Sequence, residues 1–126
     1  WLRQSNSRPH ANRKHRVRRI FQKRIILISN NITSANGGGI SLSGSGTVSI
    51  NDSAITGNQA TGNGGGIAIL FGSTGNLNIT DTVILSNKAN NGAGVFADNT
   101  GFTKINNSTI ALNIVCIQFR WHMQNV

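Results

Sequence analysis

The chain has 126 residues and a formal net charge of +9, with 12 Lys and Arg against three Asp and no Glu. This length allows one domain at most, and the single cysteine excludes an internal disulfide framework and a Cys-ligated zinc site. No apolar run reaches the ~18 residues that a membrane-spanning helix needs. Because the chain begins at Trp1 and its sole methionine is Met123, we expect a fragment or a processed piece.

The first predicted segment is a basic leader, residues 1–24. It holds nine of the 12 Lys and Arg, together with two histidines, and it contains no glycine. Val17, Ile20 and Phe21 stand near helical spacing among these cations. Three interpretations stay open. The leader is a basic helix that caps one end of the fold, a surface that binds an anionic polymer or lipid, or a linker or non-native sequence.

Residues 25–113 contain three short motifs that recur in a fixed order. The first motif reads Gly37-Gly38-Gly39-Ile40, then Gly64-Gly65-Gly66-Ile67, then Gly92-Ala93-Gly94-Val95, at offsets of 27 and 28 residues. The second is an isoleucine followed three positions later by asparagine, in Ile28…Asn31, Ile55…Asn58, Ile84…Asn87 and Ile110…Asn113. The third is Ile50-Asn51-Asp52-Ser53, Ile79-Thr80-Asp81-Thr82 and Ile105-Asn106-Asn107-Ser108. Such periodicity is the signature of a repeat architecture.

Each repeat favours short strands over helices. Apolar and polar residues alternate in 40–43, 47–50 and 77–80, as in strands with one buried face. Gly, Asn, Ser and Thr dominate elsewhere, and they are poor helix formers. A unit of about 27 residues suits one coil of a solenoid with three strands and three corners. We therefore predict an all-β fold, a right-handed parallel β-helix fragment of about three coils.

Stacking of coils ~4.8 Å apart makes equivalent residues direct neighbours. Three apolar columns are expected to point inward: Ile40, Ile67 and Val95; Ile50, Ile79 and Ile105; and Ile55, Ile84 and Ile110. Asn31, Asn58, Asn87 and Asn113 are expected to form a structural ladder of side-chain amides, because an unpaired buried amide costs ~1–3 kcal/mol. The glycines Gly37, Gly38, Gly39, Gly64, Gly65, Gly66, Gly92 and Gly94 are predicted to take positive φ at a corner.

Residues 114–126 depart from the repeat, which predicts a Gly-Gly-Gly-Ile motif near positions 119–122. Trp121 and Met123 each have a single codon. If Arg120 is CGG and His122 is CAT, reading the segment one base later gives Gly-Gly-Ile. We therefore interpret this tail as a frameshifted coil, in which Cys116, Trp121 and His122 carry no function.

The GGxI and apolar-x-x-Asn motifs resemble the repeats of bacterial polymorphic outer membrane proteins. More broadly, they resemble right-handed parallel β-helix passengers of the pectin-lyase-like class. In the outer membrane proteins the second motif is usually Phe-x-x-Asn, whereas here isoleucine replaces the phenylalanine. The resemblance implies a secreted or cell-surface protein, an adhesin or autotransporter passenger, held at the outer membrane through other parts of a longer chain.

Asp52 and Asp81 are the candidate catalytic and metal residues. They occupy the same corner of adjacent coils, and a separation of ~4.8 Å is near the ~5–5.5 Å of a retaining glycosidase pair. Two stacked carboxylates could also share Ca²⁺. The competing interpretation is that Asp simply favours turns, where it bonds to its own backbone.

Four further residues belong to the variable loops. Asp98 and Lys104 flank the loop of the third coil, and Phe71 and Phe102 stand in loop regions that we take as equivalent. The two aromatic rings either form a small sugar-stacking patch or cover the end of the core.

The leading functional prediction is a non-catalytic structural or binding module without a cofactor. Its expected partners are a surface glycan or protein and further coils of the parent chain, rather than nucleic acid. One alternative is a fragment of a polysaccharide lyase or glycoside hydrolase that uses Asp52 and Asp81. Another is anionic-polymer binding through residues 1–24.

Overall fold

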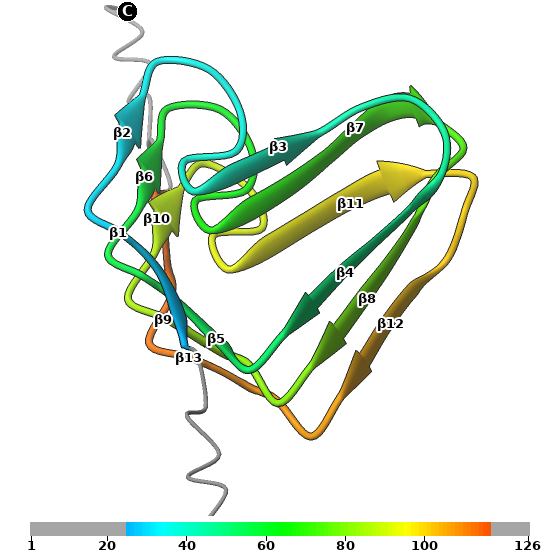
Figure 1. Ribbon diagram of the computed structural model, residues 1–126. Coiled ribbons are helices and arrows are strands. Elements are labelled where there is room, and N and C mark those ends of the chain that lie inside the picture. Colours follow the sequence, from blue (N-terminus) through cyan, green and yellow to red (C-terminus); the bar gives the residue numbers. More distant parts are fainter. Residues whose placement is uncertain (1–24, 117–126) are drawn as a thin grey trace, which may run out of the picture.

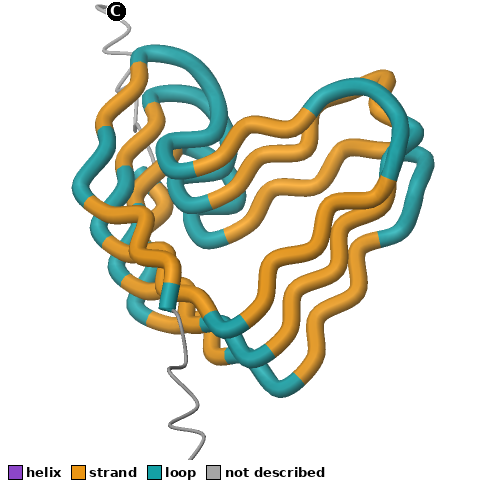
Figure 2. Tube along the Cα trace, viewed as in Figure 1, coloured by secondary structure: helices purple, strands orange, loops and turns teal. Residues whose placement is uncertain are grey.

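The computed structural model describes residues 25–116, and all regular structure in that range is β-strand. Figure 2 shows strands joined by loops, with no helix between the ends of the described range. The chain winds through successive coils that stack on one another (Figure 1). The predicted all-β parallel solenoid, with a repeat of about 27 residues, is therefore confirmed. The predicted capping helix in residues 1–24 lies outside the described residues.

Each complete coil contains four strands. The first coil has β1 (Ile26–Ser29), β2 (Ile32–Thr33), β3 (Ile40–Leu42) and β4 (Thr47–Asn51). The second has β5 (Ser53–Thr56), β6 (Gln59–Ala60), β7 (Ile67–Ser73) and β8 (Asn76–Thr80). The third has β9 (Val83–Leu85), β10 (Lys88–Ala89), β11 (Val95–Asn99) and β12 (Thr103–Asn106). A fourth coil begins with β13 (Thr109–Ala111) and β14 (Ile114–Val115).

Equivalent strands form four parallel sheets, in the orders β1-β5-β9-β13, β2-β6-β10-β14, β3-β7-β11 and β4-β8-β12. The pairing of β14 with β10 carries the stack past residue 113, as far as a bond from the Cys116 amide to the Ala89 carbonyl. The remainder of the proposed frameshifted segment, residues 117–126, lies outside the described range.

The expectation of three strands per coil was wrong. The segment that follows the Asp corner divides into two strands, such as β5 and β6, instead of running as one. The residue just before each ladder asparagine has a positive φ, which ends the first strand; these residues are Asn30, Gly57, Ser86 and Leu112, with φ of 57, 66, 55 and 54°. A left-handed residue turns the chain sharply, and for a leucine this conformation costs ~1–2 kcal/mol.

The predicted inward columns are confirmed by the strand register. Ile40 pairs with Ile67 and Ile67 with Val95, and Ile50, Ile79 and Ile105 align in the same way. The third column runs through Ile28, Ile55, Ile84 and Ile110. Together with Leu42, Ile69 and Leu77, most of these side chains form one continuous core. The second coil is buried most completely, because all four of its strands have a described neighbour on both sides.

The glycine triplets behave differently from the prediction. Only the first glycine of each triplet, Gly37, Gly64 and Gly92, has a positive φ. The second and third glycines are needed for close approach between coils. A Cβ added at Gly65 would lie 2.5 Å from the carbonyl oxygen of Lys88 and 2.6 Å from that of Ala93.

Two corners absorb the variation in coil length, and the larger change is where β7 turns into β8. Ala97 pairs with Ile69 and Asn99 with Ser73, so three residues of the second coil lie opposite one residue of the third. The second coil has one more extra residue between β6 and β7, because Lys88 pairs with Gln59 but Asn91 pairs with Asn63. Together the three extra residues explain why Ile79 follows Ile50 by 29 positions but precedes Ile105 by 26. Coil length thus varies by one residue between β6 and β7, and by two residues where β7 turns into β8.

Substitution of Ile79 by alanine tests the gradient of burial along one column. Ile79, in the second coil, is 0% exposed. Ile105, in the third coil at the end of the same column, is 41% exposed. We expect Ile79→Ala to lower the free energy of unfolding by about 2–5 kcal/mol, and Ile105→Ala to lower it by roughly 1 kcal/mol. Urea denaturation of the two variants measures both values. Equal losses would contradict the central position of Ile79.

Candidate functional site

Asp52 and Asp81 stand at the sharp corner that joins the β4-β8-β12 sheet to the β1-β5-β9-β13 sheet. Their φ values are 48° and 51°, and Asn107 at the same corner of the next coil has a φ of 44°. Asp and Asn tolerate this left-handed conformation better than most residues. The backbone amide of Asp52 donates to Thr80, and that of Asp81 donates to Asn106. The backbone shape of the corner thus favours Asp and Asn.

A column of hydroxyl groups completes the same corner. The Ser53 Oγ donates to the Asn51 carbonyl at 2.6 Å, and the Thr82 Oγ1 donates to the Thr80 carbonyl at 2.9 Å. The Ser108 hydroxyl repeats this bond to Asn106 at 2.7 Å. The sequence pattern Asn/Thr-Asp/Asn-Ser/Thr contained this signal, since a hydroxyl recurs at its third position. Its role in closing the turn was not predicted.

The two aspartates are neighbours in the strand register, but they differ in their surroundings. Asp52 is half-buried, whereas Asp81 is exposed and accepts a hydrogen bond from the Asn107 Nδ2. Among residues 25–116, no group of three or more His, Cys, Asp or Glu side chains could hold a metal ion. The geometry of the corner therefore supports a turn for these residues, and it offers no third protein carboxylate or imidazole for Ca²⁺.

The asparagine side chains of successive coils form a continuous chain of hydrogen bonds. In each step the Nδ2 of one asparagine donates to the Oδ1 of the next, from Asn31 to Asn58 at 2.9 Å and from Asn58 to Asn87 at 3.0 Å. The last step runs from Asn87 to Asn113 at 3.0 Å. All the amides in this asparagine ladder thus point in one direction along the solenoid axis.

Asn87 uses its full hydrogen-bonding capacity. It is completely buried, and its Nδ2 donates to the Ile55 carbonyl at 2.9 Å as well as to Asn113. Its Oδ1 accepts from both the backbone amide and the Nδ2 of Asn58, at 2.9 and 3.0 Å. Two donors and two acceptor sites are therefore all satisfied. The ladder is a structural device in the core, with no group left over for chemistry.

The aromatic loop residues do not cover the core. Phe71 is 88% exposed and Phe102 is 61% exposed. They also do not occupy equivalent positions. Phe71 lies in the segment of the second coil that is two residues longer than its counterpart in the third coil, whereas Phe102 lies just before β12. Asp98 and Lys104, in β11 and β12, are exposed near the same corner. This corner, which we call the variable corner (residues 70–76 and 98–104), displays aromatic and charged side chains to solvent.

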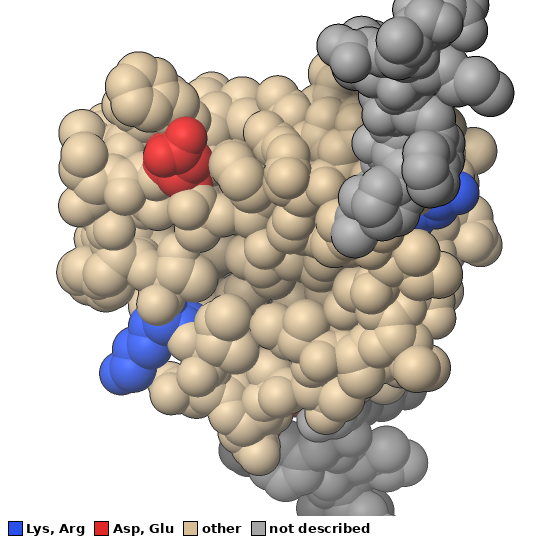
Figure 3. All heavy atoms as spheres, turned by 180° about the vertical axis from the view of Figure 1, so that it is seen from behind, with Lys and Arg blue, Asp and Glu red and all other residues tan. Residues whose placement is uncertain are grey.

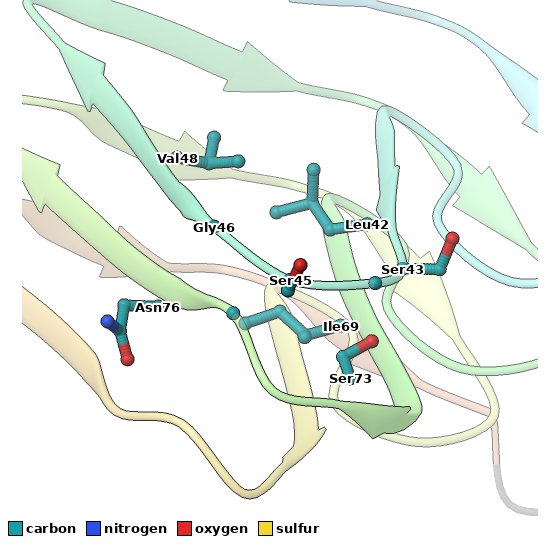
Figure 4. A pocket seen from close by; sticks show the side chains of 10 residues that line it. Leu42, Ser43, Ser45, Gly46, Val48, Ile69, Ser73 and Asn76 are labelled. Atoms are coloured by element: carbon teal, nitrogen blue, oxygen red, sulfur yellow. The ribbon is translucent and has the colours of Figure 1, made fainter.

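A small hollow lies between the turn that joins β3 to β4 and residues 73–76 of the variable corner. Leu42, Val48 and Ile69 line it with Ser73 and Asn76 and with glycines of the turn (Figure 4). The Ser73 Oγ is buried and has no hydrogen-bond partner among the described residues. The cavity volume of about 50 Å³ is far below the ~300–1,000 Å³ of a pocket for a sugar or other organic ligand. Neither aspartate of the candidate pair contributes to it.

The surface of the described residues is polar but sparsely charged. On the face shown in Figure 3, the acidic and basic side chains lie apart from one another. No helix in residues 25–116 is long and apolar enough to span a membrane. Comparisons with protein-family models, with curated proteins and with solved structures found no match. The solenoid is therefore established by its own geometry, and any closer affiliation is a proposal.

Replacement of Asn87 by alanine tests the ladder. It removes the partners of the Asn58 amide groups and of the Ile55 carbonyl, and each orphaned buried group costs ~1–3 kcal/mol. We expect a loss of about 3–5 kcal/mol of unfolding free energy in urea denaturation. The matched control is Asn31→Ala at the exposed end of the ladder, for which we expect a loss of roughly 1 kcal/mol. Similar values for the two variants would contradict the ladder as a core element.

The double variant Asp52→Asn, Asp81→Asn distinguishes a structural role of the two aspartates in the turn from a catalytic role. Asparagine already occupies this corner at position 107, so we expect a change in unfolding free energy of less than about 1 kcal/mol. Ca²⁺ titration by calorimetry and cleavage of polygalacturonate should give the same result for the variant and the original chain. Loss of Ca²⁺ binding or of cleavage activity in the variant would establish the enzyme alternative.

Proposed function

We propose that this chain is a non-catalytic binding and structural module of a secreted or surface-exposed bacterial protein. The proposal depends most on the variable corner. The columns of Ile, Leu and Asn hold the strands of successive coils in register, whereas the corner between β7 and β8 is two residues longer in the second coil than in the third. Loops that vary on a rigid scaffold are where binding is commonly located.

The side chains at the variable corner suit a surface ligand. Phe71 and Phe102 project apolar rings into solvent, and Asp98 and Lys104 add one charge of each sign beside them. Exposed aromatic rings with polar neighbours can stack on the apolar face of a sugar or insert into a protein partner. A glycan or a protein on another surface is accordingly the partner that we propose.

The cellular setting rests on the resemblance of the GGxI and apolar-x-x-Asn motifs to polymorphic outer membrane and pectin-lyase-like repeats. A passenger of that kind presents its outward side chains on a rod built from many coils. We propose that further coils of a parent protein continue this rod and that its other parts hold it at the cell surface.

The two alternative functions have less support. Asp52 and Asp81 serve the backbone of their corner, and the hollow described above lies elsewhere and is too small for a sugar. Anionic-polymer binding would depend on residues 1–24, which lie outside the described residues. Retention on heparin, compared between the full chain and the chain without residues 1–24, distinguishes polymer binding by the leader from binding at the variable corner.

Binding at the variable corner is tested with the double variant Phe71→Ala, Phe102→Ala. Because both rings are exposed, we expect folding to be unchanged and retention on immobilised polygalacturonate, mucin glycans or fibronectin to fall at least about tenfold for any probe that the original chain binds. The matched control is Leu27→Ala, an exposed apolar residue in β1. Retention that falls equally in the control, or in neither variant, would contradict this site.

A further inference from the structure

The small hollow beside the variable corner arises from a difference in length between two stacked coils. By the strand register, residues 43–46 of the first coil lie opposite residues 70–75 of the second. The first coil thus spans this turn with four residues and the second with six, which leaves a space between the two layers (Figure 4). Figure 1 shows this turn on the opposite side of the coil from the start of β1. The hollow is therefore built by the first two coils themselves.

The lining of the hollow has an apolar part and a polar part. Leu42, Val48 and Ile69 supply the apolar side chains. Ser45 and Ser73 each supply a hydroxyl group, and the Ser73 Oγ is buried without a hydrogen-bond partner within residues 25–116. Buried hydroxyls are nearly always paired in folded proteins. The Ser73 hydroxyl therefore marks a place where a polar atom of a bound molecule would be favourable.

The size and the charge of the hollow restrict what can enter it. None of the described residues that line it is charged, so a carboxylate or a sulfate group would find no counter-charge there. Its volume of about 50 Å³ is roughly three to five times the ~10–15 Å³ that holds one water molecule. A group of about four non-hydrogen atoms fits this space, whereas a sugar ring does not. The expected occupant is therefore small and neutral, with an apolar end and a polar end.

We propose that the hollow binds the acetamido group of an N-acetylated sugar in a surface glycan. The inference rests on the glycan binding proposed above for the variable corner, and it names the substituent that is recognised. An acetamido group is neutral, has the required size, and carries a methyl group at one end and an amide at the other. The methyl group would contact Leu42, Val48 and Ile69. The amide carbonyl and N–H would pair with the Ser45 and Ser73 hydroxyls, since a hydroxyl both donates and accepts.

The sugar ring itself would stay outside the hollow, at the surface of the variable corner. The exposed Phe71 lies two residues from both Ile69 and Ser73 in β7. Its ring can stack on the apolar face of the sugar whose acetamido group enters the hollow. Gly44 and Gly46 have open space around them, because a Cβ added at either would meet no atom within 4 Å. The turn between β3 and β4 therefore has room to shift and admit the acetamido group to the buried Ser73 hydroxyl.

Two tetrasaccharides with the same backbone test recognition of the acetamido group. Chitotetraose carries an acetamido group on each ring, whereas cellotetraose carries a hydroxyl at that position. With the full-length chain, we expect saturation-transfer NMR to give its strongest signal at the acetyl methyl protons of chitotetraose. We also expect NMR titration to show at least about tenfold tighter binding of chitotetraose than of cellotetraose. Equal affinities, or a strongest signal at the ring protons, would overturn the inference.

Substitutions in the lining test the location of the site. Ser73→Ala removes the unpartnered hydroxyl, and we expect chitotetraose binding to weaken about threefold to tenfold without loss of stability. Val48→Phe places a larger side chain at the hollow, and we expect it to abolish the saturation-transfer signal of the methyl protons. The matched control is Val83→Phe in β9, because Val48 and Val83 are 37% and 36% exposed. Urea denaturation verifies that the variants fold alike. Unchanged binding in Val48→Phe, or an equal loss in Val83→Phe, would contradict the site.

The outcome can be distinguished from a failure of the proposed function. Suppose that the chain binds polygalacturonate or fibronectin through Phe71 and Phe102 but does not bind chitotetraose. The acetamido inference is then overturned, while binding at the variable corner stands. If the chain binds none of these molecules, both are overturned.

Discussion

The stacking of identical coils at the spacing of parallel β-strands is the constraint on which the rest of this structure depends. Backbone hydrogen bonds between layers fix the spacing at ~4.8 Å, so a residue at one position of a coil always contacts the same position of the next. Columns of like residues follow directly. Apolar columns such as Ile50, Ile79 and Ile105 can fill the interior, and a polar column is tolerated there only if its members satisfy one another.

The asparagine ladder meets that condition in full and has a further consequence. Because each amide donates toward the following coil, the stack has a direction, with unused donors at Asn113 and an unused acceptor at Asn31 among the described residues. The two ends of the described stack therefore differ in hydrogen-bonding character.

The binding that we propose lies at the variable corner, where stacking restricts the length of the coil least. The inward columns and the Gly65 close approach leave little freedom in the stacked strands. At the variable corner two residues are inserted in the second coil without disturbing the register on either side, and Phe71 projects from this insertion. The Asp52 and Asp81 corner is the opposite case, since its left-handed backbone by itself favours these residue types.

Much of the fold was determined by the sequence alone, because periodicity reports stacking directly. The offsets of about 27 residues are sufficient to identify the solenoid, its three apolar columns and the residues of the asparagine column. Tertiary structure alone decided the rest. The break between β5 and β6 depends on the φ of a single residue, for which Asn, Gly, Ser and Leu give no common pattern. The unlike positions of Phe71 and Phe102, and the direction of the ladder amides, depend on which coil pairs with which and on side-chain rotamers. A one-dimensional period does not encode these features, because they arise only when the layers are brought together.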